Sequence, residues 1–462
     1  MKLNFPKHIF VAMLGLYTAT ATAQNTQSGY FVDDYTYRFQ MNPAIGNSHN
    51  FVSMPGLGNV NVAMDGNLGI NNVLFDVNGR TSLFLNPGVS VEQVMDGLHD
   101  SNRVGADVKL SVLSSGFKAW GGYNTVSVNA RVGADVRIPK ALFSLLKEGV
   151  QNSTYDISNV RARATSYAEI ALGHSHDISP EWRVGATLKF LVGIGDMDAR
   201  FHDARLTLGT DDWSIVADAD MHASVKGLSY KTDIYTDKTD GKERRYVSGI
   251  DVDGFGPNGF GLGLDLGAIY KPAALPAWEF SASVLDLGFV SWGYDMVAST
   301  NGVKTFNTSR YTFSASENDP NSFSDEWDKV SDDISAIYQL DDMGDLGSRT
   351  TSLAATVNVG AKFTLPVYKP LSFGLLNTTR INGDFSWTDF RLSANIAPCR
   401  IFSGSVNMTA GTFGVGFGWM ANLHVTGFNL FLGMDRTLGR LAKQGVPLSS
   451  NGQVNMGINF LF

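Results

Sequence analysis

The chain has a single cysteine, no clustered basic residues of any length, and no long apolar run after its first residues. The one thiol, Cys399, can form neither an internal disulfide nor a thiolate metal cage. We expect it to be packed and inert, because a reactive thiol needs an electropositive setting that the sequence does not show. After residue 24 no apolar stretch approaches the roughly 18 residues of a membrane-spanning helix, which excludes helical spans.

The charge balance and the missing motifs exclude further classes of function. The formal net charge is -8, and the nearest approach to a basic cluster is the short stretch 242–245. Binding to phosphate backbones needs clustered Lys and Arg, so a nucleic-acid partner is not expected. The sequence has no G-x-S-x-G, H-E-x-x-H or G-x-x-x-x-G-K-[ST] motif. We therefore predict no catalytic residues, no cofactor and no enzyme activity.

The first residues indicate export. Lys2 and Lys7 precede an apolar stretch at residues 9–17, and small residues ending in Ala-Thr-Ala follow at 21–23. This pattern predicts a signal peptide over residues 1–23, with the mature chain beginning at Gln24. The apolar stretch is too short for a membrane anchor, which needs about 20 residues.

Apolar and polar residues alternate along much of the mature chain. Every second residue from Val126 to Val136 is Val or Ala, and the residues between them are polar or Gly. The same period of two recurs in residues 182–192, 213–225, 353–365, 390–396, 413–421 and 454–462. Each stretch is close to the roughly 9–11 residues with which a tilted strand crosses a bilayer. One face of such a strand would meet lipid and the other would meet the polar interior.

A soluble β-sandwich would also alternate, but three further features favour a membrane barrel. These are the signal peptide, aromatic residues at strand ends, and a last strand that ends in Phe462. We predict an all-β transmembrane outer-membrane barrel of about fourteen antiparallel strands, within a range of 12 to 16, occupying residues 105–462. Short turns at 177–181, 271–277 and 366–370 fall on the periplasmic side, and the long polar segments 227–259 and 291–349 fall outside.

Residues 24–104 alternate poorly and are predicted to form a first strand and a plug-like segment. Short loop helices are expected at residues 139–150 and 325–340, where apolar residues recur at helical spacing. The N-terminal segment contains Met41-Asn42-Pro43-Ala44 and the Gly-rich stretch 51–60. With the C-terminal barrel pattern, it resembles FadL-like outer-membrane proteins of the Bacteroidota, within which it is most similar to an uncharacterised domain family.

The resemblance implies a roughly fourteen-stranded barrel whose lumen is closed by an N-terminal plug. FadL-like proteins include ones that move hydrophobic molecules such as fatty acids across the outer membrane. Relatives in the same phylum serve the type IX secretion machinery. No ligand-binding motif of the family maps onto named residues here, so the binding residues remain unknown.

Several residues are candidate sites. His174 and His176 could hold a metal, but they share the lipid-facing parity of Leu172, no third ligand is visible, and a membrane-interface position is the simpler interpretation. The acidic stretch 317–345 lacks calcium-loop spacing, which favours a solvated surface, with loose binding of divalent ions at lipopolysaccharide as a hypothesis. Inward charges line a permeation path or pair across a filled lumen: Arg131, Asp135, Arg183, Lys189, Asp218, Asp220 and Lys226.

Two functional hypotheses follow. The first is a FadL-like barrel that binds or passes a small, apolar molecule, for which we expect an apolar cavity or a lateral gap between strands. The second is a structural or docking subunit of a secretion or surface-protein complex, for which we expect a filled lumen and exposed aromatic patches. Loop aromatics suit either hypothesis: Trp292, Tyr294, Phe306, Tyr311, Phe313 and Phe323. The expected partners are outer-membrane lipid and lipopolysaccharide, a hydrophobic ligand or an envelope protein.

Overall fold

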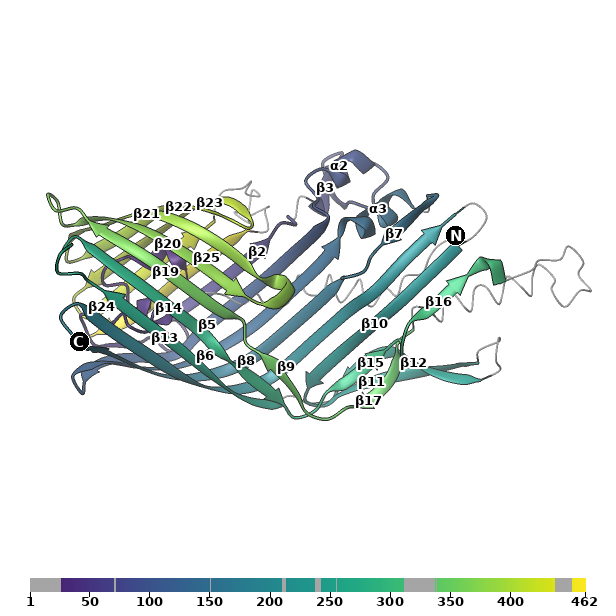
Figure 1. Cartoon of the computed structure of the whole chain (residues 1–462), viewed down its shortest axis with the longest axis horizontal. Helices are drawn as coiled ribbons and strands as arrows, with labels where there is room; N and C mark the ends of the chain where they lie inside the picture. Colours follow the sequence, from purple (N-terminus) through teal and green to yellow (C-terminus); the bar gives the residue numbers. More distant parts are fainter. Residues whose placement is uncertain are drawn as a thin grey trace, which may run out of the picture.

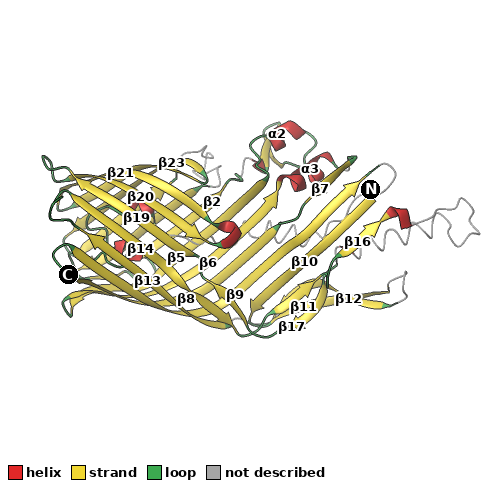
Figure 2. Ribbon diagram, in the orientation of Figure 1, coloured by secondary structure: helices red, strands yellow, loops and turns green. Residues whose placement is uncertain are grey.

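The computed structural model describes residues 26–69, 72–149, 151–209, 213–236, 242–254, 256–310, 337, 339–436 and 451–462. Nearly all of the regular structure in this part is β-strand (Figure 2). None of its helices is long and apolar enough to cross a membrane. The predicted signal peptide and nearly all of the second predicted loop helix lie outside the described residues.

Fourteen antiparallel strands form a closed barrel. Each strand pairs with the next, and the last pairs with the first, so the sheet has no free edge in the barrel wall. Closure satisfies every backbone donor and acceptor of a strand that faces lipid. In ring order the strands are β1 (Phe51–Ser53) with β2 (Asn59–Gly66), β5 (Ser101–Ala119), β6 (Gly122–Pro139), β8 (Arg161–Asp177), β9 (Trp182–Leu208), β13 (Gly259–Tyr270), β14 (Trp278–Trp292), β19 (Ala355–Thr364), β20 (Leu371–Ile381), β21 (Trp387–Cys399), β22 (Phe402–Gly411), β23 (Gly414–Val425), β24 (Phe428–Asp435) and β25 (Gly452–Leu461).

The two ends of the barrel differ. Phe51 pairs with Leu461 and with Gly116 at one end, which we call the turn end because the connections between strands there are all short. The three predicted periplasmic turns are all at this end, on the left of Figure 1, and the two long segments leave from the opposite, loop end. The predicted fold class, strand number and turn asymmetry are therefore confirmed.

The outer wall is apolar, as the period of two predicts. Leu188, Leu262 and Phe289 are exposed on it, whereas their neighbours Lys189 and Gly263 face the lumen, where Lys189 is buried. Aromatic side chains gather near the turn end, where Trp182 stacks on Tyr270. An apolar band bordered by aromatic residues is the surface that outer-membrane barrels present to lipid.

The predicted strand at residues 213–225 is present but does not cross the barrel. It is β10 (Trp213–Val225), which pairs with the part of β9 that continues past the barrel wall. Its apolar side chains Ile215 and Ala217 are buried against Leu206 and Phe306, not exposed to lipid. The expectation that this stretch has one lipid-facing side is wrong, because loop-end elements cover that side.

The loop end carries an extension of the sheet and two small helices (Figure 1). The first predicted loop helix is confirmed as α3 (Lys140–Glu148), which buries Phe143 and Leu145. The other elements at this end are β3 (Leu74–Val77), β4 (Arg80–Leu83), α2 (Val91–Met95), β7 (Ser153–Asp156), β11 (Leu228–Thr236), β12 (Glu243–Val252), β15 (Met296–Ser299), β16 (Lys304–Asn307), η4 (Thr308–Arg310), β17 (Asp341–Asp345), β18 (Arg349–Ser352) and η5 (Gly383–Phe385).

Candidate functional site

The barrel interior holds the N-terminal residues 26–46, which we call the lumenal segment. It contains the short helices η1 (Gln27–Gly29) and η2 (Arg38–Gln40), and its aromatic side chains form one buried cluster with wall residues such as Phe431. Tyr35 and Tyr37 donate hydrogen bonds to the wall residues Asn455 and Asn459, each at 2.9 Å. The segment is thus fixed to inward-facing polar side chains. That it acts as a plug stays a prediction.

The Asn42-Pro43-Ala44 motif lies where the wall has no side chains. A Cβ atom added at Gly185 of β9 would overlap the carbonyl group of Pro43, and one added at Gly267 of β13 would lie 2.9 Å from Pro43 Cδ. Asn42 Nδ2 donates to the carbonyl oxygen of Ala282 at 3.3 Å, while Asn42 Oδ1 accepts from the Ala44 amide at 3.0 Å. Close backbone approach explains why glycine occupies both wall positions. We call this contact of Gly185 and Gly267 with Pro43 the glycine seat.

A buried carboxylate holds the start of the lumenal segment. Asp435 of β24 accepts hydrogen bonds from the backbone amides of Gln27 and Ser28, at 2.7 and 3.2 Å, and from the Ser28 hydroxyl. It also pairs with Arg391 of β21 at 2.9 Å. The side chains of Asp435 and Arg391 are 1% and 5% exposed. This arrangement, the Asp435 latch, ties residues that are far apart in the sequence.

Charged side chains of both signs line the lumen beyond the segment. Arg131 of β6 pairs with Glu169 and with Asp286, both at 3.0 Å. Lys189 of β9 pairs with Asp265 at 2.7 Å and with Asp286 at 2.5 Å. Asp286 has a left-handed backbone, φ 58°, at a point where two residues of β14 oppose Asp265 of β13. This bulge turns the Asp286 carboxylate toward both cations.

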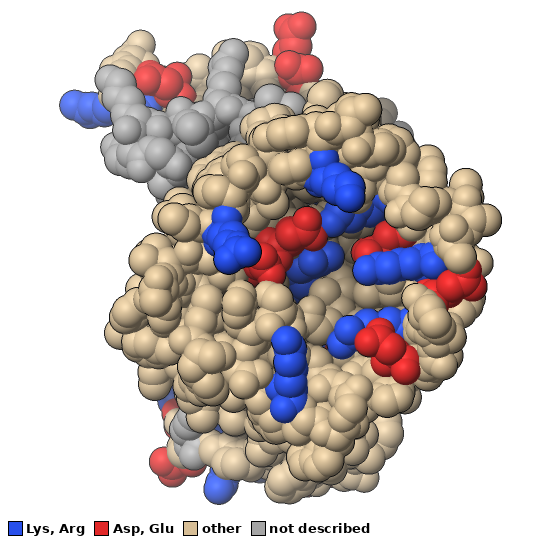
Figure 3. All heavy atoms as spheres, turned by 90° about the vertical axis from the view of Figure 1, so that its left-hand side faces the viewer, with Lys and Arg blue, Asp and Glu red and all other residues tan. Residues whose placement is uncertain are grey.

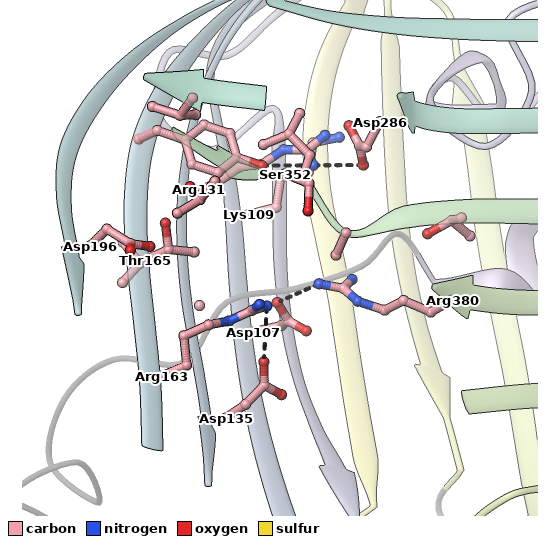
Figure 4. A pocket seen from close by; sticks show the side chains of 18 of the residues that line it. Asp107, Lys109, Arg131, Asp135, Arg163, Thr165, Asp196, Asp286, Ser352 and Arg380 are labelled. Atoms are coloured by element: carbon pink, nitrogen blue, oxygen red, sulfur yellow. Dashed lines mark hydrogen bonds and ion pairs between the residues drawn. The ribbon is translucent and has the colours of Figure 1, made fainter. Parts of the chain in front are cut away.

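The charges enclose a cavity of about 320 Å³ inside the barrel. Gln27 and Gln40 of the lumenal segment bound it on one side, and Arg161 and Thr350 lie on the loop-end side. Figure 4 shows Lys109, Arg163, Asp135 and other charged side chains from several strands directed into this space. Figure 3, which faces the turn end, shows Lys, Arg, Asp and Glu around a hollow. The cavity is large enough for a small molecule.

The loop-end rim of the cavity is closed by ion pairs. Arg161 holds Asp198 through two hydrogen bonds of 2.9 and 2.5 Å and donates a third, of 2.8 Å, to Asp384 in the turn between β20 and β21. Burial raises the pKa of Asp384, but the hydrogen bond and charge of Arg161 outweigh it and hold this pKa below its usual range. A charged Asp384 therefore fixes the turn against β8.

The structure brings together only some of the predicted inward charges. Arg131, Asp135 and Lys189 face the lumen, and Arg183 lies near the turn end, 3.5 Å from Asp177. Asp218 and Asp220 lie on β10, with Lys226 just beyond its end, so these three are in the sheet extension and not on a path through the barrel.

Sequence reasoning missed Lys109, Glu169, Asp265, Asp286 and Arg380. One signal could have found two of them. Asp265 and Asp286 each interrupt an apolar strand in the same four-residue sequence, Leu-Asp-Leu-Gly. A charge in an otherwise apolar stretch of a membrane barrel needs a partner across the lumen.

The remaining candidates gather no site. His174 and His176 are exposed on the outward face at the turn end, with stacked rings 6.0 Å apart, as the parity predicts. No group of three or more His, Cys, Asp or Glu side chains among the described residues could hold a metal ion. The acidic stretch lies outside the described residues except for its last part, in and before β17. Cys399 is exposed as the last residue of β21, so the expectation that it is packed is wrong.

The described loop aromatics form neither an apolar entrance for a ligand nor a contact surface for another protein. Trp292 is buried with Leu191 and Val290 inside the barrel, and Phe306 is buried in the sheet extension. Tyr294 donates a hydrogen bond to the carbonyl oxygen of Val225. Tyr311, Phe313 and Phe323 lie outside the described residues.

Comparison with known families gives an assignment. A profile described as "Family of unknown function (DUF5723)" matches residues 43–435. The chain belongs to this family. The DUF5723 match begins at Pro43 of the glycine seat and ends at Asp435 of the latch, so it includes every wall residue of the cavity. The predicted membership of an uncharacterised family is confirmed, and the bacterial phylum stays a prediction.

Solved structures with a similar outline are barrels. The Ralstonia pickettii toluene transporter TbuX is 10% identical, with a TM-score of 0.44 and coverage of 94% of this chain and 95% of that one. The Pseudomonas putida toluene transporter TodX is 8% identical, with a TM-score of 0.40 and coverage of 96% and 95%. A Pseudomonas aeruginosa FadL homologue is 9% identical, with a TM-score of 0.34 and coverage of 96% and 94%. No curated protein matches the DUF5723 chain. The fold assignment rests on the strand pairing described above.

Proposed function

We propose that this chain is an outer-membrane barrel that binds a small molecule in its lumen, as a step in moving that molecule across the outer membrane. The observation that carries this proposal is the cavity between the lumenal segment and the loop end. A barrel that served only as a scaffold would have no need of a space of this size bounded by oriented polar groups.

The lining of the cavity bears on the kind of molecule. The sequence predicts an apolar ligand, but most of the lining is charged or polar, with Tyr167, Leu285, Val290 and Leu353 as a smaller apolar part. Apolar surface gains little by contact with charged groups, which would lose hydration without acquiring new partners. Passage of an apolar molecule through this cavity is therefore the less favoured form of the proposal.

One observation favours the docking alternative. The sheet extension and the hairpin of β11 and β12 project beyond the barrel at the loop end, and Ile234, Ile250 and Val252 are exposed on the hairpin. Exposed apolar side chains on a projecting element suit contact with another protein. This alternative predicts a stable protein partner and no small molecule in the lumen.

Native mass spectrometry of protein extracted from its own membranes tests the proposal. We expect a small molecule bound one to one in the wild type and lost in Thr165→Trp, which places an indole at the cavity wall. Leu188→Trp is the matched control, because it adds the same side chain to the outward face. A reproducible protein partner without any bound small molecule in the wild type would replace the proposal with the docking role.

A further inference from the structure

Lys109 of β5 differs from the other cations around the cavity. It is 3% exposed and lines the cavity, yet its ammonium group makes no hydrogen bond or ion pair with any residue that the structure describes. Lys189, which is similarly buried, has two carboxylate partners. An ammonium group has three donors, and leaving them without acceptors in a buried site is costly.

The carboxylates near Lys109 are occupied. Asp286 is shared between Arg131 and Lys189. Glu169 forms an ion pair with Arg131 at 3.0 Å and accepts a hydrogen bond from the side-chain amide of Asn129 at 2.8 Å. Their negative charge therefore attracts Lys109, but neither carboxylate forms a hydrogen bond or ion pair with it. The free donors of Lys109 face the cavity, where the acceptor must come from water or from a ligand.

Two guanidinium groups of the cavity lie beside carboxylates without a hydrogen bond to them. Arg163 lies 3.7 Å from Asp135, and Arg380 lies 3.7 Å from Asp107, both longer than a hydrogen bond (Figure 4). Arg163 also donates a hydrogen bond to the amide oxygen of Asn382. Guanidinium groups bind carboxylates through paired hydrogen bonds when the geometry allows. A ligand carboxylate would thus meet donors on more than one side of the cavity.

Two other carboxylates of the cavity are already held by cations. Asp196 accepts a hydrogen bond from Arg349 at 2.6 Å, and Asp198 accepts two hydrogen bonds from Arg161. A cationic ligand bound to Asp196 or Asp198 would have to displace these partners, and the guanidinium groups would then remain unpaired. The ammonium group of Lys109 needs hydrogen-bond acceptors, which an anionic ligand supplies and a cationic ligand does not.

We propose that the cavity takes a small, polar organic acid whose carboxylate binds Lys109. The charged lining favours a compact molecule with further polar groups over one with a long apolar chain. This inference rests on the proposed function and specifies its ligand class.

Isothermal titration of the purified full-length barrel with succinate tests the inference. We expect saturable binding by the wild type, weakened about tenfold or more in Lys109→Gln, because a hydrogen bond to a charged group is lost. Lys109→Arg should retain most of the affinity. Lys231→Gln is the matched control, because Lys231 is exposed on β11, outside the cavity. Heat-modifiable gel migration verifies that each variant is folded.

The outcomes separate the inference from the proposed function. Succinate binding that is unchanged in folded Lys109→Gln, or heat from putrescine or toluene but none from succinate, would overturn the assignment to an organic acid while leaving a lumenal binding site. If Lys109→Gln does not fold, Arg380→Gln takes its place with the same expected weakening. Absence of binding by every probe, together with no molecule in protein from native membranes, would refute the proposed function itself.

Discussion

Replacing Asp435 should release the start of the lumenal segment and destabilise the barrel. Asp435→Ala removes the acceptor for the Gln27 and Ser28 amides and leaves the Arg391 guanidinium buried without its carboxylate. Breaking a buried pair by removing one partner costs about 3–5 kcal/mol. We expect a loss of this size in the free energy of unfolding, because Asp435 and Arg391 are almost entirely excluded from solvent.

The effect should be local as well as global. Hydrogen exchange followed by mass spectrometry should show faster exchange in peptides from residues 26–41, whose anchoring contacts include this latch. Asp435→Asn keeps an acceptor oxygen but loses the charge, so its effect should be smaller than that of the alanine variant. Unfolding in guanidinium chloride, followed by heat-modifiable gel migration, measures the change in the free energy of unfolding of the whole barrel.

A solvent-exposed pair provides the control. Asp251 lies 3.4 Å from Lys231 on the projecting hairpin, and their side chains are 58% and 62% exposed. Asp251→Ala should cost less than about 1 kcal/mol, because exposed ion pairs contribute little. If Asp435→Ala unfolds like this control and exchange in residues 26–41 is unchanged, the latch does not hold the segment and the reasoning is wrong.

Three further predictions concern the seat, the rim and the turn end. Gly185→Val should cost about 1–3 kcal/mol and speed hydrogen exchange around Pro43, because its side chain overlaps the segment; unchanged exchange would contradict the seat. The lowered pKa of Asp384 means that its contact with Arg161 stabilises the turn above the ordinary carboxyl pKa of about 4 and is lost as pH falls through the lowered value. Exchange in the turn should therefore rise on acidification in the wild type but not in Asp384→Asn, and equal profiles would exclude this role. Cys399 should react with an impermeant maleimide only after the outer membrane is opened, because the turn end is expected to face the periplasm. Labelling of Cys399 in intact cells would show that the turn end faces the outside.

Much of the barrel could be predicted because its physics is local. In a strand between lipid and a polar lumen, apolar and polar residues must alternate. The alternation in residues 126–137 and 182–192 therefore predicts such strands without any knowledge of their neighbours. The lengths of the connections then assign the ends of successive strands to the two ends of the barrel, without knowledge of which strands pair. The same reasoning located α3, whose apolar side chains recur at helical spacing.

The features that the sequence did not predict depend on contacts between distant segments, which the period of the apolar residues does not encode. β10 alternates like a spanning strand, but elements at the loop end cover its apolar face. Cys399 is the last residue of β21, and its exposure depends on where that strand ends. A polar residue on the inward face is predictable, but which charge it meets across the lumen is not.

The cavity illustrates the same limit. Its cations and carboxylates come from β5, β6, β8, β9, β14 and β20, and only closure of the barrel brings them together. Arg131 meets Asp286 across a separation of 155 residues. Lys109 has no partner among the described residues, and this is likewise a property of the closed barrel, because it depends on how Arg131 and Lys189 share the nearby carboxylates.

The most direct test of a lumenal binding site is a high-resolution structure of the protein extracted from its own membranes without added organic acids. The account predicts density for one compact molecule in the cavity, with an oxygen within hydrogen-bond distance of Lys109 Nζ. A cavity that contains only ordered water, with a water molecule as the acceptor for Lys109, would contradict it.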